Sequence, residues 1–166
     1  RLFDITTKID VITNFIDIKK IEAKVMPCKR DLLAPKSHKI ITHISNFRPL
    51  KRIQDVIKIF EKILPTVPSK LLMVGEGPEK QKAMDYVKKK GLTESISFLG
   101  NSNEIDKILC YSDLFLLPSE KESFGLSALE AMANKVPVIS SNAGGIPEVN
   151  KDNFSGYLSD VGDLDG

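Results

Sequence analysis

Short apolar runs alternate with helix-like segments from His38 onward, and this alternation constrains the fold of the chain more than any other feature. The apolar runs cover residues 39–46, 70–75, 95–100, 113–118 and 136–141, with a weaker one at 156–159. Between the first two runs, Ile53, Val56, Ile57 and Phe60 recur at the spacing of an amphipathic helix. Apolar strands separated by helices belong in a parallel sheet that is covered on both faces and connected by right-handed crossovers. The sequence therefore predicts an α/β fold with a doubly wound, Rossmann-like parallel sheet.

The two ends of the chain depart from this alternation. Residues 1–36 combine one apolar run, at 9–16, with a polar stretch that contains Pro35 and has no clear period. We interpret residues 1–36 as an extended, interdomain-derived segment and residues 37–166 as the folded domain. The chain begins with Arg1 and stops soon after a short strand, without a helix to cover the sheet edge. We therefore expect a fragment of a longer protein that is truncated at its C-terminus.

Composition excludes several classes of function. The 166 residues are 42% hydrophobic and 28% charged, which is typical of one globular domain. A net charge of +2, with no basic run interleaved with aromatic residues, argues against nucleic acid. No apolar run approaches the length of a membrane span, and the N-terminus lacks the layout of a signal peptide. Cys28 and Cys110 are isolated in the sequence, so we predict packing residues in a reduced, cytoplasmic protein.

Polar and glycine-containing segments follow each of the first five predicted strands. In parallel α/β sheets, ligands bind outside the carboxyl ends of the strands, which all lie at one edge. The convergence of such segments at this edge predicts one ligand site there. In strand order, the segments are 46–52, Gly75 to Pro78, Gly100 with Asn101, the turn around Glu122, and Gly144 with Gly145.

The turn between Glu122 and Glu130 carries the strongest signal for a ligand. Ser123 is predicted to cap a helix and Gly125 to allow close backbone approach, and the unpaired N–H groups of the first turn attract anions. Glu130 lies among apolar residues, where a carboxylate needs a partner or a ligand. Two surface acids that occur together by chance are the alternative. We interpret the two carboxylates as acceptors for sugar hydroxyls and not as a general acid and base.

Three cations lie between the first strand and a helix that we expect to begin near Pro49. Arg48, Lys51 and Arg52 oppose the dipole of that helix, so they do not serve its stability. A solvated basic loop explains the trio taken alone. Because the Glu122 turn is expected at the same sheet edge, we predict a diphosphate clamp in which Arg48 binds in bidentate fashion and Lys51 acts as a point charge.

Two glycine-containing turns are open to two interpretations. Gly75 and Gly77 follow a strand, but Lys80 occupies the place of the third glycine in a dinucleotide fingerprint. This segment either forms a tight turn or admits the backbone of a nucleotide. Gly144 and Gly145 either contact a donor sugar or only turn the chain.

The histidines and the tail acids receive no functional role from the sequence. His38 and His43 have no Ser, Cys or Asp partner at an interpretable spacing, so core or strand-edge positions are expected for both. Asp163 and Asp165 match a D-x-D pattern that some glycosyltransferases use to hold a metal. Because the pattern stands in a glycine-containing tail, we expect a solvated loop and no metal.

Four ordered motifs resemble the C-terminal domain of retaining GT-B glycosyltransferases of family 4, the glycosyl transferases group 1. The similarity runs from about residue 9 to the end, and the motifs are Phe98-Leu99-Gly100 and residues 111–119, 122–133 and 144–148. The resemblance implies one half of a GT-B enzyme that transfers a hexosyl group with retention. It implies a nucleotide-sugar donor, with UDP-N-acetylglucosamine expected, and neither a metal nor another cofactor.

The resemblance also implies roles for individual residues. Arg48 and Lys51 would neutralise the leaving diphosphate, although many family members place the clamp arginine where this chain has Asn46. Glu130 would hold the ribose hydroxyls, and the base would lie near Gly100 and Asn101. The donor sugar and phosphate would meet Glu122, Ser123 and the N–H groups of Phe124, Gly125 and Leu126.

The resemblance implies a missing partner as well. In GT-B enzymes an N-terminal domain holds the acceptor, so we expect this fragment to be inactive alone. A homo-oligomer of the full-length protein is one option, and the sequence leaves the oligomeric state open. A non-catalytic nucleotide-sugar-binding module is one alternative. An NAD-dependent dehydrogenase domain is another alternative. Its fingerprint requires glycines in the turn after the first strand, but residues 45–52 contain no glycine.

Overall fold

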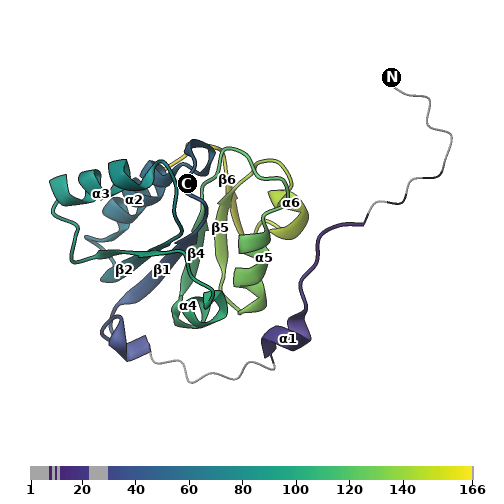
Figure 1. The fold of residues 1–166 in the computed structure, drawn as a ribbon, viewed down its shortest axis with the longest axis horizontal. Helices are drawn as coiled ribbons and strands as arrows, with labels where there is room; N and C mark the ends of the chain where they lie inside the picture. Colours follow the sequence, from purple (N-terminus) through teal and green to yellow (C-terminus); the bar gives the residue numbers. More distant parts are fainter. Residues whose placement is uncertain (1–7, 9, 11, 23–29, 166) are drawn as a thin grey trace.

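A six-stranded parallel sheet forms the centre of the domain. The computed structural model describes residues 8, 10, 12–22 and 30–165 (Figure 1). Every observed strand boundary lies within two residues of its predicted position, so the doubly wound α/β prediction is confirmed. The strand order is β3-β2-β1-β4-β5-β6. The strands are β1 (Lys39–Ile44), β2 (Ser69–Val74), β3 (Ile96–Gly100), β4 (Leu114–Leu117), β5 (Val138–Ser141) and β6 (Gly156–Ser159).

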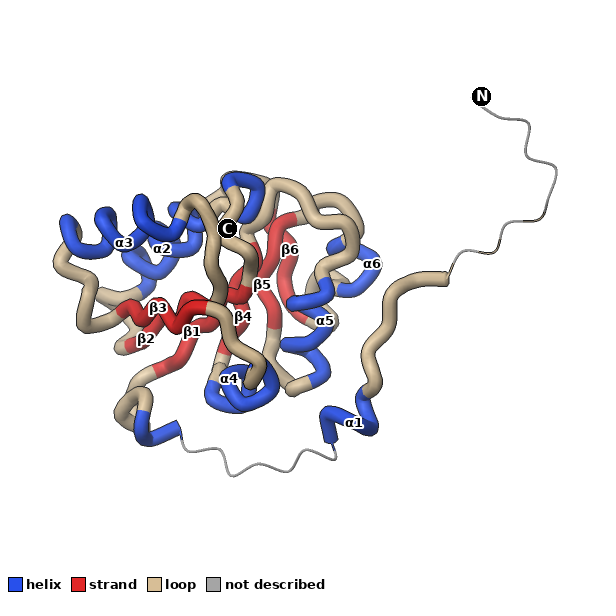
Figure 2. The backbone as a smooth tube through the Cα atoms, in the orientation of Figure 1, coloured by secondary structure: helices blue, strands red, loops and turns tan. Residues whose placement is uncertain are grey.

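Helices cover both faces of the sheet. Figure 2 shows α2 and α3 on one side and α4 and α5 on the other. Alternate residues of each strand face opposite sides, so Ile41 and Leu116 pack under α2 and α3, while Phe115 packs under α4 and α5. The helices of the domain are α2 (Ile53–Ile63), α3 (Lys80–Lys89), α4 (Ile105–Tyr111), α5 (Leu126–Ala133) and α6 (Ile146–Val149).

The described part of the N-terminal segment contains one short helix, α1 (Ile18–Glu22), and a 3-10 turn, η1 (Arg30–Leu32). The turn is tied to the sheet because Arg30 Nη1 lies 2.6 Å from the Asp113 carboxylate. Ile12 and Phe15 are exposed along the segment that leads away from the domain (Figure 1). The division at residue 36 stays a prediction, and its beginning lies outside the described residues. No helix in the described ranges is long and apolar enough to cross a membrane.

Two predicted helix starts are wrong. Pro49 opens a 3-10 turn, η2 (Pro49–Lys51), and α2 begins only at Ile53, after a residue in the left-handed region. Ser123 does not cap α5, because Gly125 occupies the N-cap position at φ +90°. Glycine adopts this left-handed backbone without steric cost. The helix α5 therefore begins two residues later than it would with Ser123 as its N-cap.

The prediction for the cysteines is wrong at Cys110. Its side chain is exposed on the solvent side of α4 and is not a free thiol. The neighbouring Leu109 and Tyr111 take the buried positions of that helix instead. Cys28 lies outside the described residues.

Candidate functional site

The candidate site lies where the strand order reverses. β1 is followed along the chain by β2 on one side and is flanked by β4 on the other, so the connections leave the sheet in opposite directions between β1 and β4. The backbone register of β1 with β4 ends at Thr42 and Phe115. Crevices outside the carboxyl ends of strands form at such switch points. The loops after β1 and β4 face each other there.

The first cleft at this point, which we name the Lys51 cleft, has a volume of about 490 Å³. It is formed by the loops after β1, β4 and β5. The predicted clamp residues and the predicted sugar-facing turn therefore meet, as expected from the convergence of strand ends. The lining residues are Asn46, Arg48, Leu50, Lys51, Lys121, Glu122, Ser123 and Gly144.

A second cleft, the Asn101 cleft, opens on the other side of Asn46 and has a volume of about 430 Å³. It is formed by the ends of β1, β2 and β3 and by the start of α4. Asn46 lines both clefts, so the two are adjacent. The lining residues are Ile44, Ser45, Asn46, Val74, Gly75, Asn101, Ser102, Asn103 and Ile105.

Lys51 and Glu122 pair directly with each other. Lys51 Nζ lies 2.5 Å from Glu122 Oε1, and the two side chains are only 15% and 10% exposed. Ser119 Oγ donates a second hydrogen bond to the same carboxylate oxygen at 2.9 Å. The sequence predicted separate roles for these charges and missed both Ser119 and the pairing. The ion pair ties the β1 loop to the β4 loop at the wall of the Lys51 cleft.

The three predicted cations have different surroundings. Arg48 is exposed in the Lys51 cleft, and no side-chain partner for it exists among the described residues. Arg52 instead pairs with Asp55 at 2.5 Å and lies outside the cleft lining. Arg48 is therefore the cation that is available to an incoming anion, next to the paired Lys51.

Glu130 is half-buried on α5 and has no hydrogen-bond or ion-pair partner for its carboxylate within the described ranges. Burial raises its pKa above the usual value, and the nearby Asp106 carboxylate adds to this effect. Glu130 lines neither cleft, but Asp106 follows Ile105, which lines the Asn101 cleft. A half-buried carboxylate without a partner fits a group that waits for hydroxyl donors.

The glycine-containing turns hold the loops together. A Cβ on Gly75 would lie 1.7 Å from the Ser45 carbonyl oxygen, and one on Gly144 would lie 2.0 Å from that of Glu122. A Cβ on Gly77 would lie 2.2 Å from the Asn46 carbonyl oxygen, and one on Gly145 would lie 2.3 Å from that of Ser123. These glycines therefore let backbone pack on backbone, and Gly75 and Gly144 also line the clefts.

The remaining predicted site residues line neither the Lys51 cleft nor the Asn101 cleft. Gly100 has no side chain, but its carbonyl accepts the Gly75 N–H at 2.8 Å and so positions the neighbouring Asn101. The other three residues, Phe124, Gly125 and Leu126, form the turn that leads into α5. The backbone N–H groups at the start of a helix have no partner within it.

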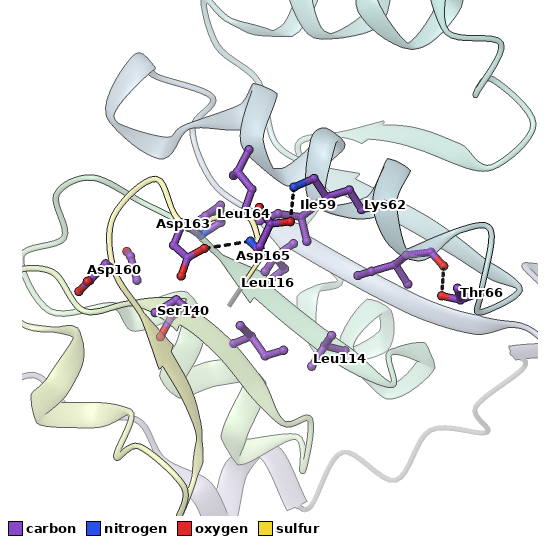
Figure 3. A pocket seen from close by; sticks show the side chains of 15 residues that line it. Ile59, Lys62, Thr66, Leu114, Leu116, Ser140, Asp160, Asp163, Leu164 and Asp165 are labelled. Atoms are coloured by element: carbon purple, nitrogen blue, oxygen red, sulfur yellow. Dashed lines mark hydrogen bonds and ion pairs between the residues drawn. The ribbon is translucent and has the colours of Figure 1, made fainter.

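A third cavity, of about 280 Å³, lies apart from these residues, between α2, the middle of the sheet and the C-terminal tail (Figure 3). Asp163 and Asp165 of the D-x-D pattern line it, and Asp165 pairs with Lys62 at 2.5 Å. Within the described residues, no group of three or more His, Cys, Asp or Glu side chains could hold a metal ion. The absence of a metal stays a prediction.

His43 is fully buried on β1, as expected, whereas His38 is half-buried before that strand. The His43 ring bonds to the Leu116 carbonyl and to Ser45, which lines the Asn101 cleft. The sequence missed this contact, because the only signal for it is the two-residue spacing of His43 and Ser45.

The parallel sheet with a cleft at its switch point is that of a ligand-binding, Rossmann-like α/β domain, and the comparison with known proteins assigns the family. The chain belongs to the glycosyl transferases group 1, whose family profile matches residues 28–165. The resemblance noted from the motifs is therefore confirmed. Structural neighbours are GT-B glycosyltransferases, which confirms the predicted GT-B half.

One relative is the N-acetyl-alpha-D-glucosaminyl L-malate synthase of Bacillus anthracis, which is 46% identical over 159 residues, covering 95% of this chain and 42% of that protein. A solved structure of HepE from Anabaena in complex with UDP and glucose superposes with a TM-score of 0.83 at 25% identity, over 93% of this chain and 44% of that one. A variant of TarM from S. aureus was solved with UDP, Fondaparinux and alpha-GlcNAc-glycerol. It superposes with a TM-score of 0.80 at 29% identity, over 98% of this chain and 31% of that one. The chain thus spans less than half the length of these relatives.

Proposed function

We propose that this chain is the donor-binding half of a retaining glycosyltransferase and that a UDP-sugar binds across the Lys51 and Asn101 clefts. The observation that carries the proposal is that the two clefts share Asn46 at the switch point. A nucleotide sugar has an anionic diphosphate between a sugar and a nucleoside. Such a ligand fits one cleft with cations next to a second cleft with amide and apolar side chains. The complex of HepE with UDP and glucose supports this choice.

The diphosphate belongs in the Lys51 cleft. Arg48 is exposed there and without a partner among the described residues, so its guanidinium can bind two phosphate oxygens. Lys51 adds positive charge while Glu122 holds it in place. Asn46 lines the same cleft as Arg48 and Lys51, and it stands in the position where many family members carry the clamp arginine. We assign the bidentate contact to Arg48 and a single hydrogen bond to Asn46.

The nucleoside belongs in the Asn101 cleft. The Asn101 and Asn103 side chains and the apolar wall of Ile44 and Ile105 suit a planar base with polar edges. Glu130, which has no partner in the described chain, accepts the ribose hydroxyls from its position beside α4. The donor sugar then faces Glu122, Ser123 and the turn before α5.

The proposed reaction needs charge stabilisation more than a protein base. The bond from the anomeric carbon to the diphosphate oxygen breaks, and a bond to the acceptor hydroxyl oxygen forms on the same face of the sugar. A phosphate oxygen of the leaving diphosphate takes the hydroxyl proton. Positioned cations and helix N–H groups stabilise the developing negative charge, so the chain needs no metal for this step.

We further propose that the sugar is N-acetylglucosamine and the acceptor L-malate. This choice is supported by the name of the 46% identical relative from Bacillus anthracis. The acceptor is assigned to an N-terminal domain of the full-length protein. The chain alone should bind UDP weakly and transfer nothing.

The test measures UDP binding by calorimetry and turnover of UDP-N-acetylglucosamine with L-malate. In the full-length protein, Lys51→Ala and Glu130→Ala should each weaken UDP binding at least about tenfold, because each removes a hydrogen bond to or from a charged group. Lys62→Ala, which alters a lysine far from both clefts, is the matched control. Unchanged affinity in both variants would show that the site is wrong. Tighter binding of NAD than of UDP would favour a dehydrogenase, and turnover by the 166 residues alone would contradict the two-domain proposal.

A further inference from the structure

His43 is a fully buried polar side chain that the proposed function leaves without a role. It follows Thr42, the last residue of β1 in backbone register with β4. Beyond Thr42, a hydrogen bond from the His43 side chain links β1 to β4 where the backbone register has ended. Its Nδ1 lies 2.8 Å from the carbonyl oxygen of Leu116 on β4. His43 therefore links the two strands whose following loops form the Lys51 cleft.

The hydrogen bonds of the ring have a defined direction. A carbonyl oxygen can only accept, so Nδ1 carries the proton of the imidazole. Burial, with a contribution from the charge of Lys51, lowers the His43 pKa to about 4, so the ring is neutral and Nε2 accepts. Ser45 Oγ lies 2.8 Å from Nε2 and donates to it. The same oxygen accepts the N–H of Phe47 at 3.3 Å.

These bonds end at a strained bend. Phe47 has a φ of +36°, in the left-handed region that a non-glycine residue adopts only where its surroundings hold it. Its ring is fully buried and lies over the His43 ring with centroids 6.2 Å apart. Its carbonyl accepts the N–H of Glu79 at 3.0 Å. The bend is thus held from both sides, by the serine on one and by the loop after β2 on the other.

We propose that His43 is a positioning residue for the donor. Through Ser45 and Phe47 it sets the directions of Asn46 and Arg48, the two exposed residues on either side of the bend that line the clefts. This inference rests on the proposed function for its ligand. The hydrogen-bond relay from Leu116 to Phe47 can be tested without any ligand.

The first measurement follows hydrogen exchange at the Phe47 amide in the full-length protein. Ser45→Ala removes the acceptor with little change in packing, and His43→Phe keeps a ring but removes both hydrogen bonds. Each should raise the exchange rate of this amide about five- to tenfold, the effect of one neutral hydrogen bond. Val136→Ala, a buried change near the start of β5, is the matched control and should leave this amide unchanged. Wild-type rates in both relay variants would overturn the relay.

The second measurement is UDP affinity with the KM and kcat for the donor. Each relay variant should raise Kd and KM by about three- to tenfold with a smaller change in kcat, and the double variant should bind no more weakly than His43→Phe alone. In an Arg48→Ala background, Ser45→Ala should have a smaller effect. Additive effects of Ser45→Ala and Arg48→Ala, or an equal loss in Val136→Ala, would overturn positioning. A wild-type protein that fails to bind UDP would refute the proposed function, while the exchange rates still decide the relay.

Discussion

Removing one partner of the Lys51–Glu122 ion pair should destabilise the domain more than removing both. The nitrogen and oxygen are 2.5 Å apart and the side chains are 15% and 10% exposed. At an effective dielectric constant of about 20, the Coulomb attraction is roughly 7 kcal/mol, and the desolvation of two ions offsets much of it. A single substitution leaves the other charge buried without a partner, which costs about 3 to 5 kcal/mol when burial is complete.

The magnitudes follow from what each variant leaves behind. Lys51→Met leaves the Glu122 carboxylate with only the Ser119 hydroxyl, so we expect a loss of about 3 kcal/mol in the free energy of unfolding. Glu122→Gln keeps an oxygen that can accept from Ser119 and Lys51, so about 2 kcal/mol is expected. The double variant has no uncompensated charge and should lose less than either single variant, about 1 kcal/mol or less.

Urea unfolding of the 166-residue chain, followed by far-UV circular dichroism, measures all four states of this double-mutant cycle. Lys62 and Asp165 provide the matched control, because their ion pair has the same 2.5 Å distance but side chains that are 48% and 81% exposed. The coupling energy of the control should stay below about 1 kcal/mol. Additive effects at Lys51 and Glu122, or equal coupling in both pairs, would refute the view that burial gives the pair its energy.

Three further outcomes are expected. Arg48→Ala should leave the free energy of unfolding within about 0.5 kcal/mol of wild type, since the side chain is exposed, and should weaken UDP binding at least about tenfold by calorimetry. Gly144→Ala should cost more than about 2 kcal/mol in urea unfolding because its Cβ would lie 2.0 Å from a backbone oxygen, whereas Gly91→Ala, at φ +69° in open space, should cost about 1. His43 has a pKa of about 4 when folded and 6.5 as its ordinary value, so the unfolded chain binds the proton first. Its contribution to stability is therefore complete above pH 6.5 and is lost as the pH falls towards 4, by up to about 3 kcal/mol in urea titrations, and His43→Phe should flatten this dependence.

The strands and the edge of the sheet that carries the site could be predicted from the sequence. Strands buried on both faces are continuous apolar runs, so β4 was placed to within one residue at each end. Parallel strands bring all their carboxyl ends to one edge, which is why Arg48 and Glu122 were expected near each other. The environment of Glu130 also followed from its apolar neighbours on α5.

The pairings within the site could not be predicted. Lys51 and Glu122 are 71 residues apart, and their contact depends on how far the loops after β1 and β4 reach across the switch point. The start of α5 depends on a left-handed backbone at Gly125, which favoured a later start than the preceding Ser123 indicated. The bonds of His43 depend on the separation of two strands, which one sequence does not reveal.

The close glycine contacts have a consequence for any redesign of the proposed donor site. The loop after β2 touches the backbone of the loop after β1, and the loop after β5 touches that of the loop after β4. Each loop therefore packs directly on the backbone of its neighbour, with no room for a side chain between them. Grafting one loop from a relative would place foreign backbone against an unchanged surface. Loops exchanged as neighbouring pairs, residues 45–52 with 75–79 and residues 118–125 with 142–145, are the units in which specificity can be transplanted.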